Sequence, residues 1–383
     1  MDEPEYFEVF IEGHDGYHTY RIPAVIVTQK GTLLAFAEGR ASRGDQSAND
    51  MVLKRSLDNG ETWEKMQVIA EFGEDSINNP QPVIVEDSGK IILFFQIFPY
   101  PANTKALVPG YEDPGGEEAS YINKPPFIQV LPRRVTKAYY ITSDDDGVTW
   151  SDPVDISRQV KRPEIPSLSS GPGIGIQLRR DKHAGRIIMP FNQGPWNDWR
   201  VYAAYSDDQG KTWAYGDIAP EPETMEGHAN EVQMVELVDG TIMLNARIQG
   251  GNKLRKISYS KDAGETWSPL EDDPALIEPV CQASLIRYTD PLDGYKSRLL
   301  FSNPATQTKR INGTVYMSYD EGKTWPVSKV ICDGNFAYSC LTVLPDYKIG
   351  CLFETGVKDA YQVLTFARFT IAWLSDGKDS LKE

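Results

Sequence analysis

The sequence predicts an all-β fold, and within that class a six-bladed β-propeller of four-stranded antiparallel sheets. Two observations support this prediction. Helical patterns are scarce along the 383-residue chain, whereas short runs rich in β-branched and aromatic residues are frequent. An eight-residue pattern, S-x-D-x-G-x-T-W, also recurs five times, and its copies begin at Ser56, Ser143, Ser206, Ser260 and Ser318. The last three copies are separated by about the length of one four-stranded sheet with its turns.

Each copy of this pattern, here called a box, predicts a hairpin turn. The central Asp and Gly supply side-chain hydrogen bonds to the backbone and a positive φ, and the Trp can pack over the turn. Strand-like runs precede the boxes, for example residues 51–56, 138–143 and 201–206. A calcium loop is disfavoured by spacing, because taking Gly147 as the loop glycine puts Thr142 at the first ligand position. We therefore expect the boxes to be structural, and we expect no metal site.

The five boxes, together with unboxed β-type sequence at residues 338–354 and 361–374, predict six blades. Residues 5–12 would pair into the last blade and close the ring. We therefore expect one domain over residues 1–383, with a Pro- and Gly-rich insertion at about 99–134. A loop of this length is either a decorated outer loop or a lid over a site. As a lid, its candidate substrate contacts are Tyr111, Tyr121 and Phe127.

The composition is that of a globular protein, with 40% hydrophobic and 25% charged residues. The formal net charge of -16 argues against a nucleic-acid partner, and it means that any anion-binding site must be a local cluster of arginines. No apolar run is long enough to span a membrane. The chain starts without a secretory signal pattern, so we expect a cytoplasmic protein, or a secreted or periplasmic one if a leader has been removed. The oligomeric state stays open.

The tetrapeptide Y-R-I-P at residues 20–23 precedes the repeated boxes. Together these motifs resemble the sialidase (neuraminidase) superfamily, and the resemblance covers nearly the whole chain. It implies an enzyme that removes terminal sialic acid, a sugar whose anomeric carbon carries a carboxylate. In the family three arginines bind this carboxylate, a task that suits planar guanidinium groups because they form paired hydrogen bonds. The matching positions are Arg21 in Y-R-I-P, Arg247 in T-I-M-L-N-A-R and Arg310 in K-R-I-N-G.

The resemblance also implies an acid/base and a nucleophile. The acid/base is an aspartate on the loop after the first strand pair, which gives Asp45, with Asp50 as the alternative. The nucleophile is a tyrosine, and Tyr338 in N-F-A-Y-S-C matches its motif. Cys340 stands where the family often has Asp, so the surroundings of this tyrosine differ from the family pattern.

The base that activates the tyrosine is implied to be Glu231 in H-A-N-E-V, with Glu236 as the weaker candidate. A neutral phenol suits a substrate that carries its own carboxylate, because a carboxylate nucleophile would be repelled. Tyrosine has an unperturbed pKa of about 10, so a base must take its proton as attack occurs. The expected reaction is hydrolysis with retention of the anomeric configuration.

Further residues are implied to support the substrate site. Arg40 resembles an additional active-site arginine, although it could equally be an exposed rim charge. Glu354 in G-C-L-F-E resembles the family glutamate that braces the first arginine, and Asn79 resembles a rim element of the pocket. Phe191 or Trp196 could pack against the N-acetyl group of the sugar, or could be ordinary packing residues.

This chemistry is expected to need no cofactor. The expected partners are sialylated glycans, whether on glycoproteins, oligosaccharides or gangliosides, and no nucleic acid. Three alternatives stay open. The same residues could transfer the sugar to another acceptor or form an anhydro product, or they could act on a related 2-keto sugar acid. The propeller could also bind sialosides without turnover, although a lectin would need only the arginines.

Overall fold

The computed structural model describes residues 3–98, 136–163, 165, 167–194 and 198–381. The predicted insertion at about 99–134 lies outside the described residues, and so does Trp196. Strands dominate the described part, and its α-helices are the single turns α3 (Ser157–Val160) and α4 (Ile371–Leu374). None of the helices in these residues has the length and apolar character needed to cross a bilayer. The predicted all-β class is confirmed.

The strands are arranged in antiparallel sheets, of which four are ordered along the chain between residues 19 and 277. The first contains β2 (Thr19–Val27), β3 (Leu33–Arg40), β4 (Asp50–Ser56) and β5 (Gln67–Ala70). The second contains β6 (Ser76–Ile84), β7 (Ile91–Phe98), β8 (Lys137–Ser143) and β9 (Val154–Asp155). The third contains β10 (Ser167–Ser170), β11 (Ile176–Gln177), β12 (Ile187–Gly194), β13 (Arg200–Ser206) and β14 (Ala214–Tyr215). The fourth contains β15 (His228–Glu236), β16 (Ile242–Gln249), β17 (Leu254–Ser260) and β18 (Glu271–Ile277).

The remaining strands form a seven-stranded sheet that joins the two ends of the chain. It contains β19 (Ser284–Thr289), β20 (Arg298–Pro304), β21 (Ile311–Ser318), β22 (Val327–Val343), β23 (Ile349–Gly356), β24 (Val363–Phe369) and β1 (Glu5–Ile11). The N-terminal strand β1 pairs antiparallel with β24, with Glu5 opposite Arg368. The predicted pairing of residues 5–12 with the C-terminal strands is therefore confirmed.

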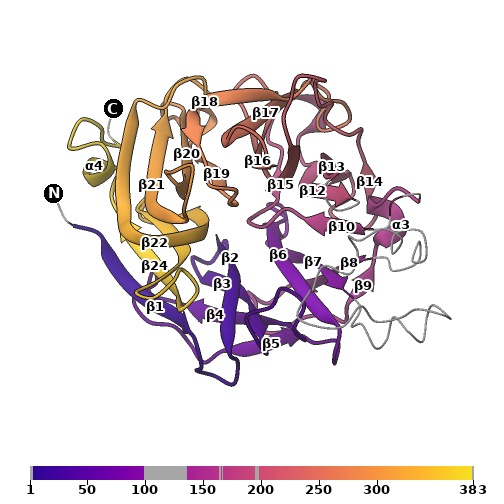
Figure 1. Cartoon of the computed structure of the whole chain (residues 1–383), viewed down its shortest axis with the longest axis vertical. Helices are drawn as coiled ribbons and strands as arrows, with labels where there is room; N and C mark the ends of the chain where they lie inside the picture. Colours follow the sequence, from indigo (N-terminus) through magenta and orange to yellow (C-terminus); the bar gives the residue numbers. More distant parts are fainter. Residues whose placement is uncertain (1–2, 99–135, 164, 166, 195–197, 382–383) are drawn as a thin grey trace.

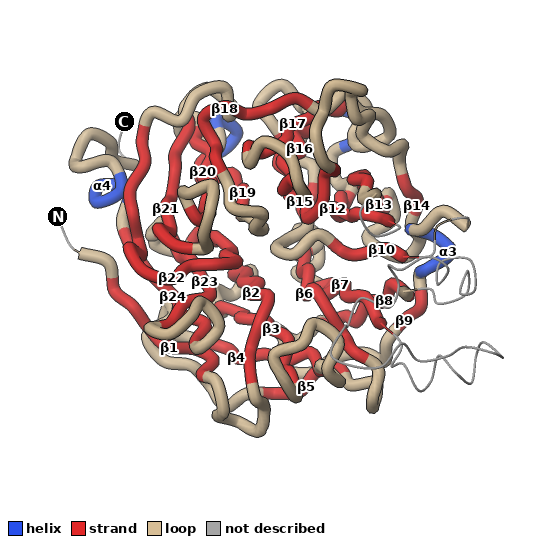
Figure 2. The backbone as a smooth tube through the Cα atoms, in the orientation of Figure 1, coloured by secondary structure: helices blue, strands red, loops and turns tan. Residues whose placement is uncertain are grey.

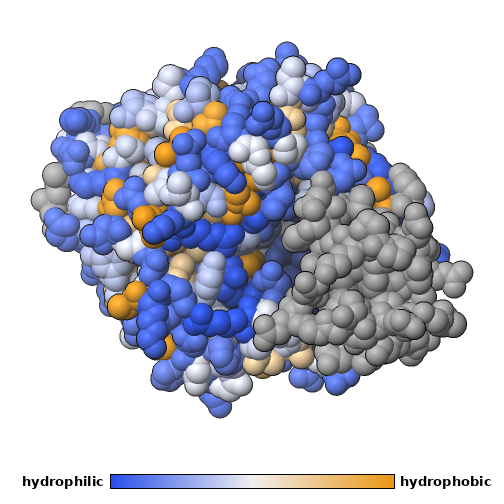
Figure 3. Space-filling view, in the orientation of Figure 1, coloured by the Kyte–Doolittle hydropathy of each residue, from blue (hydrophilic) through white to orange (hydrophobic). Residues whose placement is uncertain are grey.

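The sheets lie side by side around a central axis (Figure 1), with β2, β6, β15 and β19 near the centre. Figure 2 shows that helix is confined to short segments at the periphery. Apolar side chains from neighbouring sheets fill the spaces between them; for example, Phe94 of the second sheet packs edge-on against Phe191 of the third. The coloured part of the face seen in Figure 3 is mostly hydrophilic, with hydrophobic residues scattered over it. This propeller-like arrangement brings loops from different sheets together at the axis.

All five boxes form turns with the same hydrogen bonds. In each box the Ser hydroxyl accepts from the Gly amide at 2.9 Å. The Asp carboxylate accepts from both the amide and the hydroxyl of the Thr. At Asp58 the bonds from Thr62 lower the pKa of the carboxyl to about 2. The box residues thus bond to their own turns, as the sequence predicted.

Replacing Asp208 of the third box with alanine should lower the free energy of unfolding by about 1–3 kcal/mol. Its carboxylate accepts from the Ser206 hydroxyl at 2.8 Å, the Thr212 amide at 2.8 Å and the Thr212 hydroxyl at 2.6 Å. Urea denaturation measures the change. The exposed Lys211 of the same turn provides the control, and Lys211→Ala should stay within about 0.5 kcal/mol of the wild type. An unchanged stability of Asp208→Ala would contradict the turn-fixing role.

Candidate active site

Most of the residues expected to form the site come together in the structure, although the bonded pair Arg21 and Glu354 lies 333 positions apart in the sequence. Each comes from a different element. Arg21 lies on β2, Arg40 on β3, Asp45 on the β3–β4 loop, Asn79 on β6, Glu231 on β15, Arg247 on β16, Arg310 just before β21, Tyr338 on β22 and Glu354 on β23. The propeller-like arrangement of the sheets therefore supplies the site with residues from several of them.

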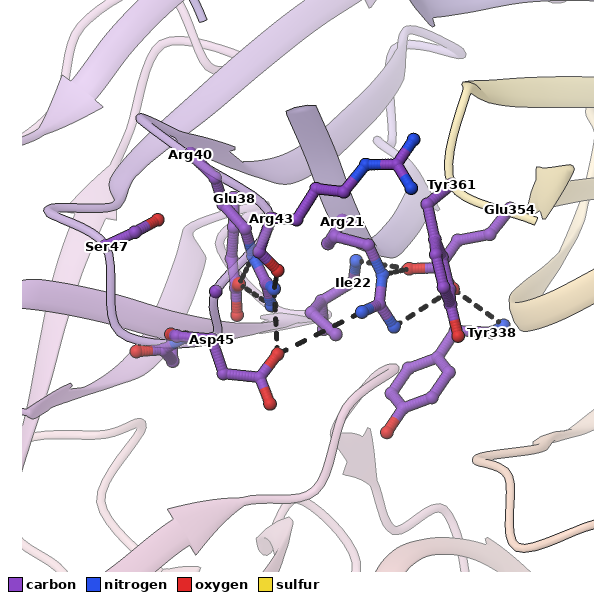
Figure 4. A network of polar contacts seen from close by, with 12 residues as sticks. Arg21, Ile22, Glu38, Arg40, Arg43, Asp45, Ser47, Tyr338, Glu354 and Tyr361 are labelled. Carbon is purple, nitrogen blue, oxygen red and sulfur yellow. Dashed lines mark hydrogen bonds and ion pairs between the residues drawn. The ribbon is translucent and has the colours of Figure 1, made fainter. Parts of the chain in front are cut away.

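The Arg21 guanidinium is held by Glu354 and two tyrosine rings. Its Nε and Nη2 donate to the Glu354 carboxylate at 2.6 and 3.2 Å. The same carboxylate accepts the backbone amides of Ile22 at 2.9 Å and Tyr338 at 3.1 Å. The Arg21 Cζ lies 4.1 Å from the centroid of the Tyr361 ring, which stands beside it in Figure 4. Burial opposes the positive charge of Arg21, but Glu354 outweighs it and raises the pKa of this arginine.

Backbone strain at Ile22 makes this arrangement possible. Ile22 has a φ of 59°, a left-handed conformation that β-branched residues rarely adopt and that costs roughly 1–3 kcal/mol. It lies where the pairing of β2 with β3 shifts between Arg21 and Ala24. Pro23 has no N–H to lose from the ladder at this shift. This left-handed conformation directs the Ile22 amide at the Glu354 carboxylate, which also binds Arg21.

Arg40 is buried, with 1% exposure, which excludes the reading of an exposed rim charge. Its Nε donates to Glu38 at 2.7 Å and its Nη1 to Asp45 at 2.8 Å. Glu38 is fully buried, and burial raises its pKa although Arg40 acts in the opposite direction. Figure 4 shows these side chains next to Arg21, whose Nη1 lies 4.0 Å from Asp45 Oδ1. Glu38, Arg40, Asp45 and Arg21 thus lie next to one another with alternating charges.

Asp45 is the aspartate that faces the arginines. Its side chain is 77% exposed and so is open to a ligand. Neighbouring protein atoms partly desolvate the carboxyl and act to raise its pKa, but the charges of Arg40 and Arg21 outweigh them and lower the pKa below its usual value. The alternative, Asp50, lies on β4 and accepts a hydrogen bond from the Tyr17 hydroxyl at 2.6 Å. Desolvation raises the pKa of Asp50.

Three asparagines support this part of the site. The side chains of Asn49 and Asn78 donate to the backbone carbonyl of Asp45 at 2.8 and 2.7 Å. The backbone amide of Asn79 donates to Glu38 at 2.7 Å. The Asn79 side chain donates to β10 at 2.7 and 2.9 Å. Asn79 therefore holds Glu38 through its backbone, while its side chain joins two sheets.

Tyr338, Glu231 and Arg247 form a second group. The Tyr338 hydroxyl donates to one carboxylate oxygen of Glu231. Arg247 Nη1 donates to the Tyr338 oxygen at 2.9 Å and pairs with the other Glu231 oxygen at 2.5 Å. Tyr338 is 5% exposed, and burial followed by the Glu231 charge raises its pKa well above the usual value. The phenol is therefore neutral at rest, with its proton directed at a carboxylate.

Arg310 completes the set. Its Nη1 donates to the Tyr361 hydroxyl at 3.1 Å and its Nη2 to the Val280 carbonyl at 2.9 Å. The Arg310 Cζ lies 5.2 Å from the centroid of the Tyr338 ring. Considering only the described residues, its guanidinium forms no ion pair with a carboxylate. Among Arg21, Arg40, Arg247 and Arg310, Arg310 is thus the one without a carboxylate partner in the described part of the chain.

Two weaker candidates lie away from these groups. Glu236, at the other end of β15, pairs with Arg180 at 3.0 Å. Phe191 is 1% exposed and stacks on Tyr202 in the core between two sheets. The structure therefore gives both residues packing or ion-pair roles outside the site.

Sequence reasoning missed Glu38 and Tyr361. Glu38 belongs to the same A-E-G-R stretch as Arg40, and residues two apart on a strand share a face. That spacing was a usable signal for an ion pair. Tyr361 offered no comparable signal, because its partner Arg310 lies 51 positions away.

Known proteins resemble this chain along most of its length. The family model described as BNR repeat-like domain matches residues 22–351. The chain is 34% identical to a sialidase of Micromonospora viridifaciens, over 97% of this chain and 55% of that protein. It is 33% identical to a sialidase of Bacteroides fragilis, over 90% of this chain and 61% of that protein. The chain thus spans between about half and two thirds of the length of these relatives.

A solved structure agrees with the sequence matches. The Hadza microbial sialidase Hz136 aligns with a TM-score of 0.79 and 28% identity, over 96% of this chain and 69% of that one. The chain therefore belongs to the sialidase superfamily, which confirms the resemblance drawn from its motifs.

Proposed function

We propose that the chain is an exo-α-sialidase, a glycoside hydrolase that releases terminal sialic acid from sialylated glycans with retention of configuration. The observation that carries this proposal is the hydrogen bond from the buried Tyr338 to Glu231, close to three arginines and to Asp45. A protein that only bound sialosides would need the arginines but no phenol paired with a base. The arrangement thus favours a catalyst over a lectin.

In this proposal Arg21, Arg247 and Arg310 bind the carboxylate of the sugar. Guanidinium groups suit a carboxylate because they offer two parallel N–H donors. Glu354 holds the plane of Arg21 with two hydrogen bonds. A protein of net charge -16 repels anions at long range, so the local arginines must supply the attraction. The carboxylate then fixes the anomeric carbon, C2, next to Tyr338.

The first step is attack by the Tyr338 oxygen on C2. The phenol proton passes to Glu231, which already accepts its hydrogen bond. As the new bond forms, the bond from C2 to the oxygen of the leaving group breaks. Asp45 gives its proton to that departing oxygen. The product is a sugar bonded covalently to Tyr338.

The second step releases the sugar. Asp45, now ionised, takes a proton from a water molecule, and the water oxygen attacks C2 on the face that the leaving group vacated. The bond from C2 to Tyr338 breaks, and Glu231 returns the proton to the phenol. Two successive displacements at C2 give net retention.

The charges around Asp45 should separate the pH profiles of kcat and kcat/KM. In the free enzyme the arginines lower the pKa of Asp45, so its acid form is lost as the pH rises through that low value. A bound carboxylate offsets the arginines and raises the pKa of Asp45 in the complex. The alkaline limb of kcat should therefore lie at higher pH than that of kcat/KM. Rates measured against pH with an unactivated sialoside test this, and coincident or reversed limbs would contradict it.

We also infer that the chain is one propeller domain of six blades over residues 1–383. The support is the 17-residue strand β22, whose first part pairs with β21 and whose second part pairs with β23. The seven-stranded sheet then divides into two blades that share β22. With the four other sheets this division gives six blades. A single calorimetric unfolding transition is expected, and two separated transitions would contradict the single domain.

Release of 4-methylumbelliferone from its α-sialoside tests the proposed activity, and the expected result is turnover. Measurable sialoside binding without turnover would favour a non-catalytic propeller instead. NMR of the earliest product separates the enzymatic alternatives. Hydrolysis gives α-sialic acid, an intramolecular reaction gives an anhydro sugar, and transfer gives a sialylated acceptor. Glycosides of other 2-keto sugar acids test the choice of substrate.

A further inference from the structure

The four arginines of the site differ in whether a carboxylate of the protein neutralises their charge. Three of them form ion pairs: Arg21 with Glu354, Arg40 with Glu38 and Asp45, and Arg247 with Glu231. Arg310 differs, because among the described residues its partners are the uncharged oxygens of Tyr361 and Val280. Of these four, Arg310 is therefore the arginine whose full charge remains available to a bound anion. The residues that orient its guanidinium should then strongly affect how that anion is bound.

Tyr361 contacts Arg310 and Arg21 at the same time. Its hydroxyl accepts from Arg310 Nη1 at 3.1 Å. The Cζ of Arg21 lies over the ring, 4.1 Å from its centroid (Figure 4), within the range in which an aromatic face attracts a guanidinium group. Both contacts orient an arginine without adding a negative charge that would compete with a substrate carboxylate.

The turn that carries Tyr361 is bonded to the β3–β4 loop, which carries Asp45. The Tyr361 amide donates to Asp359 at 2.8 Å. The other oxygen of Asp359 pairs with Arg43 at 2.7 Å, and Arg43 lies two residues before Asp45. The neighbouring Ala360 is buried in an apolar cluster that includes Tyr338. The position of Tyr361 is thus fixed by the Asp359 carboxylate on one side and by the packing of Ala360 on the other.

We propose that Tyr361 is a positioning residue of the carboxylate-binding site, whose hydroxyl orients Arg310 and whose ring orients Arg21. The inference rests on the proposed function, because it assigns the two arginines to a substrate carboxylate. The carboxylate is bound in both the ground state and the transition state. An interaction made equally in both states lowers KM and leaves kcat unchanged. Tyr361 should therefore act on KM.

Tyr361→Phe tests this role, because phenylalanine keeps the ring and removes only the hydroxyl. We expect KM for a sialoside to rise about tenfold, as for the loss of one hydrogen bond to a charged group, with kcat within about twofold of the wild type. Calorimetric titration with 2-deoxy-2,3-dehydro sialic acid, which carries the carboxylate but does not react, should show the same loss of affinity. Tyr6→Phe is the control, because the Tyr6 hydroxyl donates to the Ile331 carbonyl at 2.8 Å outside the site.

A double variant links the effect to Arg310. In an Arg310→Lys background, Tyr361→Phe should raise KM by much less than tenfold, because the hydroxyl then has no guanidinium to orient. A wild type that neither turns over sialosides nor binds the sugar acid would overturn the proposed function and this inference with it. A wild type that binds, together with unchanged affinity in Tyr361→Phe or fully additive losses in the double variant, would overturn the inference alone.

Discussion

Replacing Tyr338 with phenylalanine should lower kcat by about a thousandfold or more. The variant lacks the oxygen that donates to Glu231 and that would form the bond to the sugar. It keeps the ring, whose centroid lies 5.3 Å from the Cζ of Arg21 and 5.2 Å from that of Arg310. The fold and the binding of the carboxylate should therefore persist. The fluorogenic sialoside assay measures the loss, and binding of a non-reacting sialic acid analogue measures the intact site.

Tyr20→Phe is the matched control for this variant. Tyr20 is also buried, at 2% exposure, and its hydroxyl donates to the His14 carbonyl at 2.7 Å, away from Glu231. This variant should keep wild-type kcat. Full activity of Tyr338→Phe would exclude the phenol as nucleophile, and an equal loss in Tyr20→Phe would show that the loss arises from damage to the fold.

Replacing Glu354 with glutamine should lower the free energy of unfolding by about 3–5 kcal/mol and raise KM. Glu354 is fully buried, and its carboxylate accepts two bonds from Arg21 and the backbone amides of Ile22 and Tyr338. A glutamine offers one oxygen where two are used, and its NH₂ group would face a donor. Arg21 would then be a buried charge without its partner, and its guanidinium would no longer be held for the substrate.

Glu12→Gln provides the comparison for this effect. Glu12 pairs with Arg43 at 3.1 Å, and both side chains are partly exposed. The loss of such a surface pair costs at most about 1 kcal/mol. Urea denaturation with linear extrapolation measures both variants. A loss at Glu354 no larger than that at Glu12 would show that the buried carboxylate does not carry the structural role given to it here.

The features that could be predicted from the sequence are those fixed over a short stretch of chain. The boxes form their turns with hydrogen bonds between residues two and four positions apart, as between Ser206 and Gly210. Strand pairing at the ends of the chain followed from the β-type sequence of residues 5–12. The motif residues Arg21 and Tyr338 were found by pattern, and the structure brings them within one site.

The remaining features depend on contacts between distant strands. The different surroundings of Asp45 and Asp50 are one example, because Asp45 pairs with Arg40 whereas Asp50 accepts a hydrogen bond from Tyr17. Tyr361 has its role through partners that sequence spacing does not reveal. The continuity of β22 was also hidden, because C-D-G-N at residues 332–335 resembles a turn, yet β21 and β23 pair with the two parts of one long strand.

Trapping the sugar on Tyr338 tests the proposed mechanism most directly. A sialic acid analogue with fluoride at C2 and fluorine at C3 should react in the first step, because fluoride leaves without help from an acid. The C3 fluorine slows the second step by destabilising its positively charged transition state, so the covalent intermediate accumulates. Mass spectrometry of peptides from the treated protein should show the sugar on Tyr338 and no adduct in Tyr338→Phe. A sugar attached to Glu231 or Asp45, or turnover of natural sialosides without any adduct, would contradict the account.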